Sequence, residues 1–111
     1  MDILGVVPAR GGSSGVAKKS IAPLAGRPLL AYTAEAVRSS RRLTRTVLTT
    51  DDESIARVGE QCGLEVPFMR PSELAADDTP ILDVLQHVVR SLDEREGYAP
   101  AYVVLLQPTS P

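Results

Sequence analysis

Residues 2–20 read DILGVVPARGGSSGVAKKS, an apolar run followed by a loop of small and basic residues. Its first part, residues 2–8, is an apolar run without polar alternation, which is typical of a strand buried on both faces of a sheet. A loop rich in glycine, serine and alanine follows over residues 9–20. Polar loops that follow buried strands are where α/β enzymes place ligand groups. The stretch therefore predicts a ligand site directly after the first strand.

Downstream, apolar runs alternate with helical patterns, which is the sequence signature of a parallel α/β sheet. We expect three helices, in which apolar residues recur at spacings of three and four, over residues 28–40, 51–63 and 81–92. We expect three further strands, each short and rich in apolar or β-branched residues, over residues 45–50, 66–69 and 101–106. The predicted fold is a three-layer α/β/α, Rossmann-like domain with a mostly parallel sheet.

The length and the charge distribution narrow the class of ligand. A chain of 111 residues is long enough for one domain. Its net charge of −2 hides an asymmetry, because residues 1–50 carry eight Lys/Arg against two acidic residues, whereas residues 51–111 carry four against twelve. The basic first half suits an anionic ligand. Nucleic acid is a weaker interpretation, since the whole chain is acidic and offers only three Tyr and one Phe for base stacking.

Targeting signals are not evident in the sequence. The apolar start at residues 3–7 is too short for a membrane helix and lacks the basic leader of a secretory signal. The single Cys62 cannot form an internal disulfide, which favours a cytoplasmic location. The last strand leads into a polar loop ending at Pro111, and we expect the fold to continue beyond this residue, because the strand would otherwise lie near an open sheet edge.

The loop over residues 9–20 carries groups that suit phosphate. Its three glycines let backbone N–H groups approach an anion closely. Arg10 offers a planar fork of donors, and Lys18 and Lys19 add point charges that would stabilise a departing pyrophosphate. The Walker and dinucleotide motifs do not fit, because the Gly-Lys-Ser/Thr ending and a third glycine at the required place are missing. The alternative is a flexible turn with solvated basic side chains.

Residues 7–33, VPARGGSSGVAKKSIAPLAGRPLLAYT, resemble the opening of the CMP-sialic acid synthetases, also called acylneuraminate cytidylyltransferases. Three further segments match that family in the same order: TTDDESIA at 49–56, VPFMRPSELAADDTP at 66–80 and VVLLQPTSP at 103–111. The resemblance covers nearly the whole chain. It implies a single cytidylyltransferase domain over residues 1–111, which forms the N-terminal part of a longer family domain.

The resemblance also implies a reaction and its residues. The anomeric hydroxyl of a sialic-acid-like (nonulosonic) sugar would attack the α-phosphorus of CTP, with Mg²⁺ as cofactor and its aspartate ligands beyond Pro111. Arg10 and Lys19 are the implied catalytic residues, and Gln107 would face the sugar. The nucleotide-binding residues implied by position are Ala9, Arg10, Gly11, Gly12, Ser13, Gly15, Lys19, Ser20, Arg70 and Thr79. The family further implies a homodimer.

Three positions depart from the family pattern. Ser14 stands where the family usually has Lys, and Ser20 replaces an Asn. Near residues 78–81 the family often has a Thr-Ala-Ser-Ser run that touches the base; Ile81 cannot donate that hydrogen bond, whereas Thr79 can. One alternative keeps the enzyme class and changes the sugar to Kdo, legionaminate or pseudaminate. The Gly-Gly pair favours the sialic-acid branch, because Kdo enzymes usually open with a different loop. Another alternative is a non-catalytic nucleotide-binding fragment.

Acidic residues occur in two clusters. Asp51, Asp52 and Glu53 resemble a metal cluster, but acidic residues at a helix start are more often caps and partners of the helix dipole. Asp51 follows a strand directly, so it can also lie near the nucleotide. Asp77 and Asp78 are expected to cap the third helix.

Overall fold

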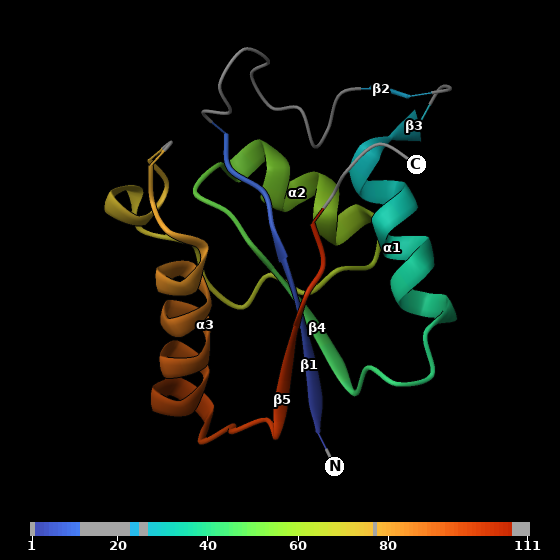
Figure 1. Ribbon diagram of the computed structural model, residues 1–111. Coiled ribbons are helices and arrows are strands. Elements are labelled where there is room, and N and C mark those ends of the chain that lie inside the picture. The colour runs from blue at the N-terminus through green and yellow to red at the C-terminus, as the bar shows by residue number, and fades with distance from the viewer. Residues whose placement is uncertain (1, 12–22, 25–26, 77, 108–111) are drawn as a thin grey trace.

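The computed structural model describes residues 2–11, 23–24, 27–76 and 78–107 of the chain (Figure 1). Its main sheet has three parallel strands in the order β4-β1-β5, which are β1 (Ile3–Pro8), β4 (Arg45–Thr49) and β5 (Tyr102–Leu105). The helices are α1 (Leu29–Ser39), α2 (Glu53–Gln61), α3 (Ile81–Glu96) and the 3₁₀ helix η2 (Ser72–Leu74). Two-residue strands that the sequence patterns did not predict pair antiparallel, β2 (Pro23–Leu24) and β3 (Arg27–Pro28).

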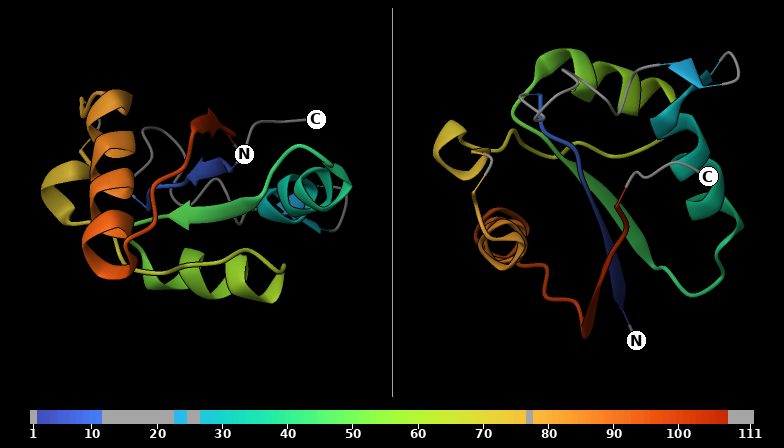
Figure 2. Two further views of the ribbon diagram at one scale, coloured as in Figure 1. Left: turned by 90° about the horizontal axis from the view of Figure 1, so that it is seen from below. Right: turned by 45° about the horizontal axis from the view of Figure 1, so that its top comes forward.

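The central strand β1 is buried on both of its faces, as its unbroken apolar run predicted. Leu4 and Val6 pack with Val88 and Leu92 of α3. Val7 packs on the other face, in a cluster built from α1, α2 and the sheet. Figure 2 shows α3 on one side of the sheet and α1 and α2 on the other. The predicted three-layer α/β arrangement with a parallel sheet is confirmed.

The ends of α2 follow the predicted signals. The Asp52 side chain accepts a hydrogen bond from the Ile55 N–H at 3.1 Å and caps the helix. Gly63 follows the helix with a φ of 95°, and the Leu64 N–H bonds back to the Gly59 carbonyl at 2.9 Å. This turn directs the chain back along the sheet.

The start of α3 differs from the prediction. Pro80 occupies the N-cap position, and no side chain caps the helix. Asp78 is exposed and lies two residues before the cap position, so the prediction that it caps α3 is wrong. Asp77 lies outside the described residues.

The segment predicted as a strand over residues 66–69 is not one. Only Glu65 forms a bridge, to Val47 of β4, with the Leu48 N–H donating to the Glu65 carbonyl at 2.7 Å. Pro67 follows and has no N–H to continue the ladder. The chain meets β4 again when the Arg70 N–H donates to the Thr50 carbonyl at 2.8 Å.

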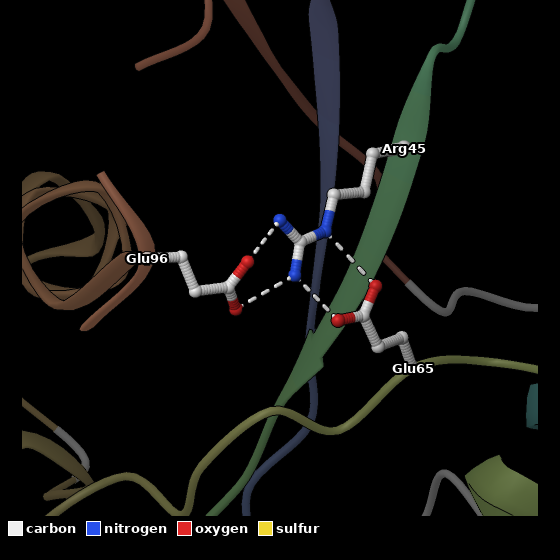
Figure 3. Close-up of polar contacts among 3 residues, drawn as sticks. All are labelled: Arg45, Glu65 and Glu96. Carbon is white, nitrogen blue, oxygen red and sulfur yellow. Dashed lines mark hydrogen bonds and ion pairs between the residues drawn. The ribbon is translucent and has the colours of Figure 1, made fainter. Parts of the chain in front are cut away.

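Arg45, at the amino end of β4, joins α3 to the segment that follows α2 (Figure 3). Its guanidinium bonds both oxygens of Glu65, and both oxygens of Glu96 at 2.9 and 3.0 Å. It also lies 4.7 Å from the centre of the Tyr98 ring. Hydrogen bonding to Arg45 lowers the pKa of Glu96. This network lies at the amino end of β4. It therefore connects α3 with the segment after α2 at the end of the sheet opposite the carboxyl ends of the strands.

β5 is the least covered strand of the sheet. Tyr102, Val103 and Val104 are all exposed, and an apolar groove of about 780 Å³ separates β5 from α1. In the described residues β5 pairs with β1 alone. No helix in the part of the chain that the structure describes has the length and apolar character needed to cross a membrane.

Candidate functional site

The carboxyl ends of all three parallel strands lie at one edge of the sheet (Figure 1). Parallel α/β folds bind their ligands at this edge. β1 leads into Ala9, Arg10 and Gly11, β4 leads into Thr50 and Asp51, and β5 leads into Leu106 and Gln107. Three groups of residues that are about 40 or more positions apart in sequence therefore lie at the same edge of the sheet.

The residues at the carboxyl end of β4 connect the neighbouring segments of this edge through hydrogen bonds. The Thr49 carbonyl accepts from the Ala9 N–H at 3.0 Å and from Arg70 Nη2 at 2.9 Å. Thr49 Oγ1 accepts from Arg70 Nε at 3.2 Å. Both Thr49 and Thr50 are buried. The loop after β1 and the segment carrying Arg70 are thus both hydrogen-bonded to Thr49, the last residue of β4.

Arg70 is a buried cation at this edge, with 5% of its surface exposed. Its third side-chain bond runs from Nη1 to the Leu74 carbonyl at 3.2 Å. Burial lowers its pKa; Asp51 opposes that shift, and the nearby charge of Arg10 adds to it. Because a guanidinium stays protonated in proteins, the edge holds a fixed positive charge facing little water. Such a charge favours an anionic ligand.

Arg10 is held between two anchored neighbours. Ala9 donates to Thr49, and the Gly11 N–H donates to Asp51 Oδ1 at 3.0 Å. A Cβ on Gly11 would lie 2.7 Å from Asp52 Oδ2 and 2.8 Å from Asp52 Cβ, so the backbone fits only without a side chain. The loop therefore leaves β1 packed against the start of α2.

The carboxylates at this edge already have structural partners. Asp51 accepts from Gly11, and Asp52 caps α2. Among the described residues, no three His, Cys, Asp or Glu side chains gather closely enough to hold a metal ion. The described residues therefore contain no preformed three-ligand metal site, and the capping interpretation of Asp52 is confirmed.

The remaining predicted residues are placed as follows. Thr79 is half-buried, and its Oγ1 accepts a hydrogen bond from the Ala76 N–H at 3.1 Å, within a turn. Gln107 is exposed just beyond β5. Five predicted residues lie outside the described part of the chain: Gly12, Ser13, Gly15, Lys19 and Ser20. The ligand contacts expected of all predicted site residues stay predictions.

Sequence reasoning missed the anchoring role of Thr49 and Thr50. Their signal was present, because two threonines follow the apolar pair Val47 and Leu48 and precede Asp51. A buried polar side chain needs a hydrogen-bond partner, and Arg70 supplies it for Thr49.

His87 on α3 is half-buried beside Phe68. Its Nδ1 has no hydrogen-bond partner among the described residues, and burial lowers the pKa of the imidazole.

Comparison with known proteins points to one family. A family model described as Cytidylyltransferase matches residues 4–111. An N-acylneuraminate cytidylyltransferase from Escherichia coli O18:K1:H7 is 37% identical over 98% of this chain and 25% of its own length. A CMP-N,N'-diacetyllegionaminic acid synthase from Legionella pneumophila is 37% identical over the whole chain and 47% of its own length. This chain thus spans about a quarter to a half of these relatives.

Solved structures share the fold. A CMP:2-keto-3-deoxy-manno-octonic acid synthetase complexed with CTP superposes with a TM-score of 0.75, at 20% identity, over 97% of this chain and 40% of the other. A cytidylyltransferase from Leptospira borgpetersenii gives a TM-score of 0.67 at 18% identity, over 97% and 42%. At these identities the likeness concerns the fold.

Proposed function

The chain belongs to the cytidylyltransferase family, and we propose that it forms the nucleotide-binding part of an enzyme that transfers a cytidylyl group from CTP to a sialic-acid-like, nonulosonic sugar. The products are a CMP-sugar and pyrophosphate. One observation carries the proposal: in a chain that matches this family, buried Arg70 and the backbone next to Arg10 are hydrogen-bonded to the same Thr49 carbonyl, at the edge of the sheet where parallel α/β folds bind ligands.

The two arginines support an anionic ligand. Arg70 bonds the Thr49 carbonyl, and the Ala9 amide next to Arg10 bonds the same carbonyl, so both positive charges belong to one edge of the sheet. Positive charge gathered in this way attracts an anion such as a triphosphate. Because Arg70 is fastened to the Thr49 and Leu74 carbonyls, its charge is positioned before the ligand arrives.

The proposed reaction is a single displacement at phosphorus. The anomeric oxygen of the sugar forms a bond to the α-phosphorus of CTP, and the bond from that phosphorus to the oxygen bridging to the β-phosphorus breaks. Pyrophosphate leaves with the electron pair of that bond, and the hydroxyl proton passes to solvent. Arg10 and Lys19 would stabilise the charge on the departing pyrophosphate. Gln107, exposed at the end of β5, would face the sugar.

We propose that magnesium takes part together with the triphosphate. Among the described residues, no group of three His, Cys, Asp or Glu side chains could hold the ion by itself. The ion would therefore enter with CTP, with triphosphate oxygens among its ligands.

The relatives support an acylated nonulosonic acid as acceptor. Their names include N-acylneuraminate, N,N'-diacetyllegionaminic acid and, at 34% identity in Campylobacter jejuni, pseudaminic acid. A 3-deoxy-manno-octulosonate cytidylyltransferase from Acidobacterium capsulatum is 33% identical, over 79% of this chain. We therefore place N-acetylneuraminate first and Kdo as the alternative acceptor.

We also propose that the enzyme is cytoplasmic and forms a homodimer. The half-buried, free Cys62 thiol supports a reducing compartment. The exposed side chains of β5 support association of this chain with further polypeptide.

The test is product formation from labelled CTP. The chain is incubated with α-³²P-labelled CTP, Mg²⁺ and a panel of N-acetylneuraminate, legionaminate, pseudaminate and Kdo. A labelled CMP-sugar, formed with one equivalent of pyrophosphate, is the expected result. CTP binding without any CMP-sugar would instead favour the second candidate function, a non-catalytic nucleotide-binding fragment, which the chain's partial coverage of its relatives favours.

A further inference from the structure

One side chain connects the loop after β1 to the exit of β4. Asp51 Oδ1 accepts the Gly11 N–H at 3.0 Å, across 40 positions of sequence. One residue before Arg10, the Ala9 N–H is held by the Thr49 carbonyl. The backbone on both sides of Arg10 is therefore fixed, and Asp51 is the one of these two anchors that a substitution can remove.

We propose that Asp51 is a positioning residue of the nucleotide site, whose carboxylate oxygen holds the Gly11 amide and thereby sets the direction in which Arg10 and its loop leave β1. The inference rests on the proposed function, because it assigns Arg10 to the triphosphate. Asp51 acts through Gly11 and is not a catalytic residue.

The neighbouring acidic residues have other roles, which separates Asp51 from them. Asp52 accepts from Ile55 and caps α2. Glu53 is exposed in the first turn of the same helix. The Asp51 carboxylate carries the hydrogen bond to Gly11, next to Arg10, whereas the Asp52 carboxylate carries the cap of α2.

The Gly11 amide is committed to the protein in this arrangement. An amide bonded to a carboxylate at 3.0 Å is not directed at a phosphate. The same holds for the Ala9 amide, which bonds Thr49. Both amides therefore shape the loop in this arrangement. The nucleotide contacts expected of Ala9 and Gly11 stay predictions.

Three substitutions separate hydrogen-bond geometry from charge. Asp51→Asn keeps an acceptor oxygen at the same distance along the side chain and removes the charge. Asp51→Glu keeps the charge and displaces the oxygen by one methylene. Asp51→Ala removes both. Glu53→Gln is the matched control, because it removes one negative charge from the same turn without touching the loop.

Two measurements are made on each variant of the full chain. The first is the ¹⁵N–¹H resonance and hydrogen-exchange rate of the Gly11 amide without ligand, which does not depend on what the protein binds. The second is the dissociation constant for CTP with Mg²⁺, alongside inorganic tripolyphosphate. Loss of a charge-assisted hydrogen bond typically corresponds to about tenfold or more in an equilibrium constant.

We expect the dissociation constants for CTP of the Asp51→Asn and wild-type chains to agree within about threefold. We expect the Asp51→Ala and Asp51→Glu chains to bind CTP at least about tenfold more weakly than wild type. We expect fast exchange of the Gly11 amide in those two variants alone. The opposite order, with Asp51→Glu like wild type and Asp51→Asn impaired, would show that charge rather than the bond matters and would overturn the proposal. An unchanged Gly11 amide in Asp51→Ala would also overturn it.

Failure of the proposed function gives a different pattern. A wild-type chain that binds neither CTP nor tripolyphosphate refutes the nucleotide site, whatever the Gly11 amide shows. If Asp51→Ala does not fold, the comparison of Asp51→Asn with Asp51→Glu carries the test by itself.

Discussion

Gly11→Ala is the substitution whose consequence follows most directly from the geometry. The new Cβ would lie 2.7 Å from Asp52 Oδ2, 2.8 Å from Asp52 Cβ and 3.1 Å from Asp52 Cγ. Carbon atoms in good contact are about 3.5–4.0 Å apart, so a shift of roughly 0.7 Å or more is required. Rotating Asp52 about χ1 does not relieve the clash, because its Cβ does not move. Either the loop or the start of α2 must give way.

The magnitude combines two contributions. Overpacking typically costs about 1–3 kcal/mol, and disturbing the Asp52 cap of α2 costs about 1 kcal/mol. We expect Gly11→Ala to lower the free energy of unfolding by about 2 kcal/mol. Because the same movement displaces Arg10, we also expect CTP binding to weaken by about tenfold or more, a change of at least about 1.4 kcal/mol.

Urea denaturation and calorimetry with CTP measure the two effects on one preparation. Gly97→Ala is the control: Gly97 has a φ of 66° after α3, with nothing within 4 Å of an added Cβ. It should cost about 1 kcal/mol through backbone strain and leave CTP binding unchanged. A Gly11→Ala chain as stable as wild type, with the same affinity for CTP, would refute the packing of this loop against α2.

Four further results are expected. Arg10→Ala should weaken CTP binding by at least about tenfold in calorimetry, since it removes a cation from the proposed triphosphate site; unchanged affinity would contradict that assignment. Tyr98→Phe should leave the midpoint of urea unfolding unchanged or raise stability by up to about 1 kcal/mol, because the buried Tyr98 hydroxyl has no partner in the described residues; a clear loss would mean that the hydroxyl is satisfied. Hydrogen bonding to Arg45 lowers the pKa of Glu96 below the unfolded value of about 4.3, so its contribution to stability is present above that value and is lost as the pH falls through the lowered pKa; Glu96→Gln should flatten this part of the acid unfolding curve, and a curve of wild-type steepness would count against the ion pair. Removing Mg²⁺ with EDTA should abolish CMP-sugar formation without changing the unfolding midpoint, because the described residues contain no group of three metal ligands; turnover in EDTA would contradict the proposed role of the ion.

Most of the fold could be predicted because its elements have strong local signals. The unbroken apolar run of β1 predicted burial on both faces, and Leu4 and Val7 indeed pack on opposite sides of the sheet. Asp52 and Gly63 marked the ends of α2 as expected. Local patterns of this kind depend on neighbouring residues, so a single sequence is sufficient to show them.

The failures arose where contacts distant in sequence decide the structure. The apolar segment at 66–69 suited a strand by composition, but Pro67 and a single bridge through Glu65 keep it out of the sheet. Ile81 matched the apolar stripe of α3 and is nevertheless 40% exposed, because the buried face of the helix runs through Val84, Val88 and Leu92. Apolar spacing alone does not show which of two neighbouring apolar rows on a helix faces the sheet.

The candidate site was predicted as a set of residues but not as an arrangement. Arg10 was identified from the chemistry of its loop and Arg70 through the family resemblance, whereas the residues at the carboxyl end of β4 that position both were not identified. The Gly11–Asp51 bond spans 40 positions, and no local pattern contains it. Thr49 accepts hydrogen bonds from the Arg70 side chain and from the Ala9 N–H. These contacts become visible only when the alignment of the parallel strands is known.

Calorimetric titration of the chain with CTP in Mg²⁺ tests the central claim most directly, with UTP, ATP and NAD⁺ as competitors and circular dichroism to establish folding. The account predicts saturable binding of CTP that is at least about tenfold tighter than binding of the other nucleotides. A folded chain that binds none of them, or that binds them all alike, would contradict a cytidine nucleotide site at the carboxyl edge of this sheet.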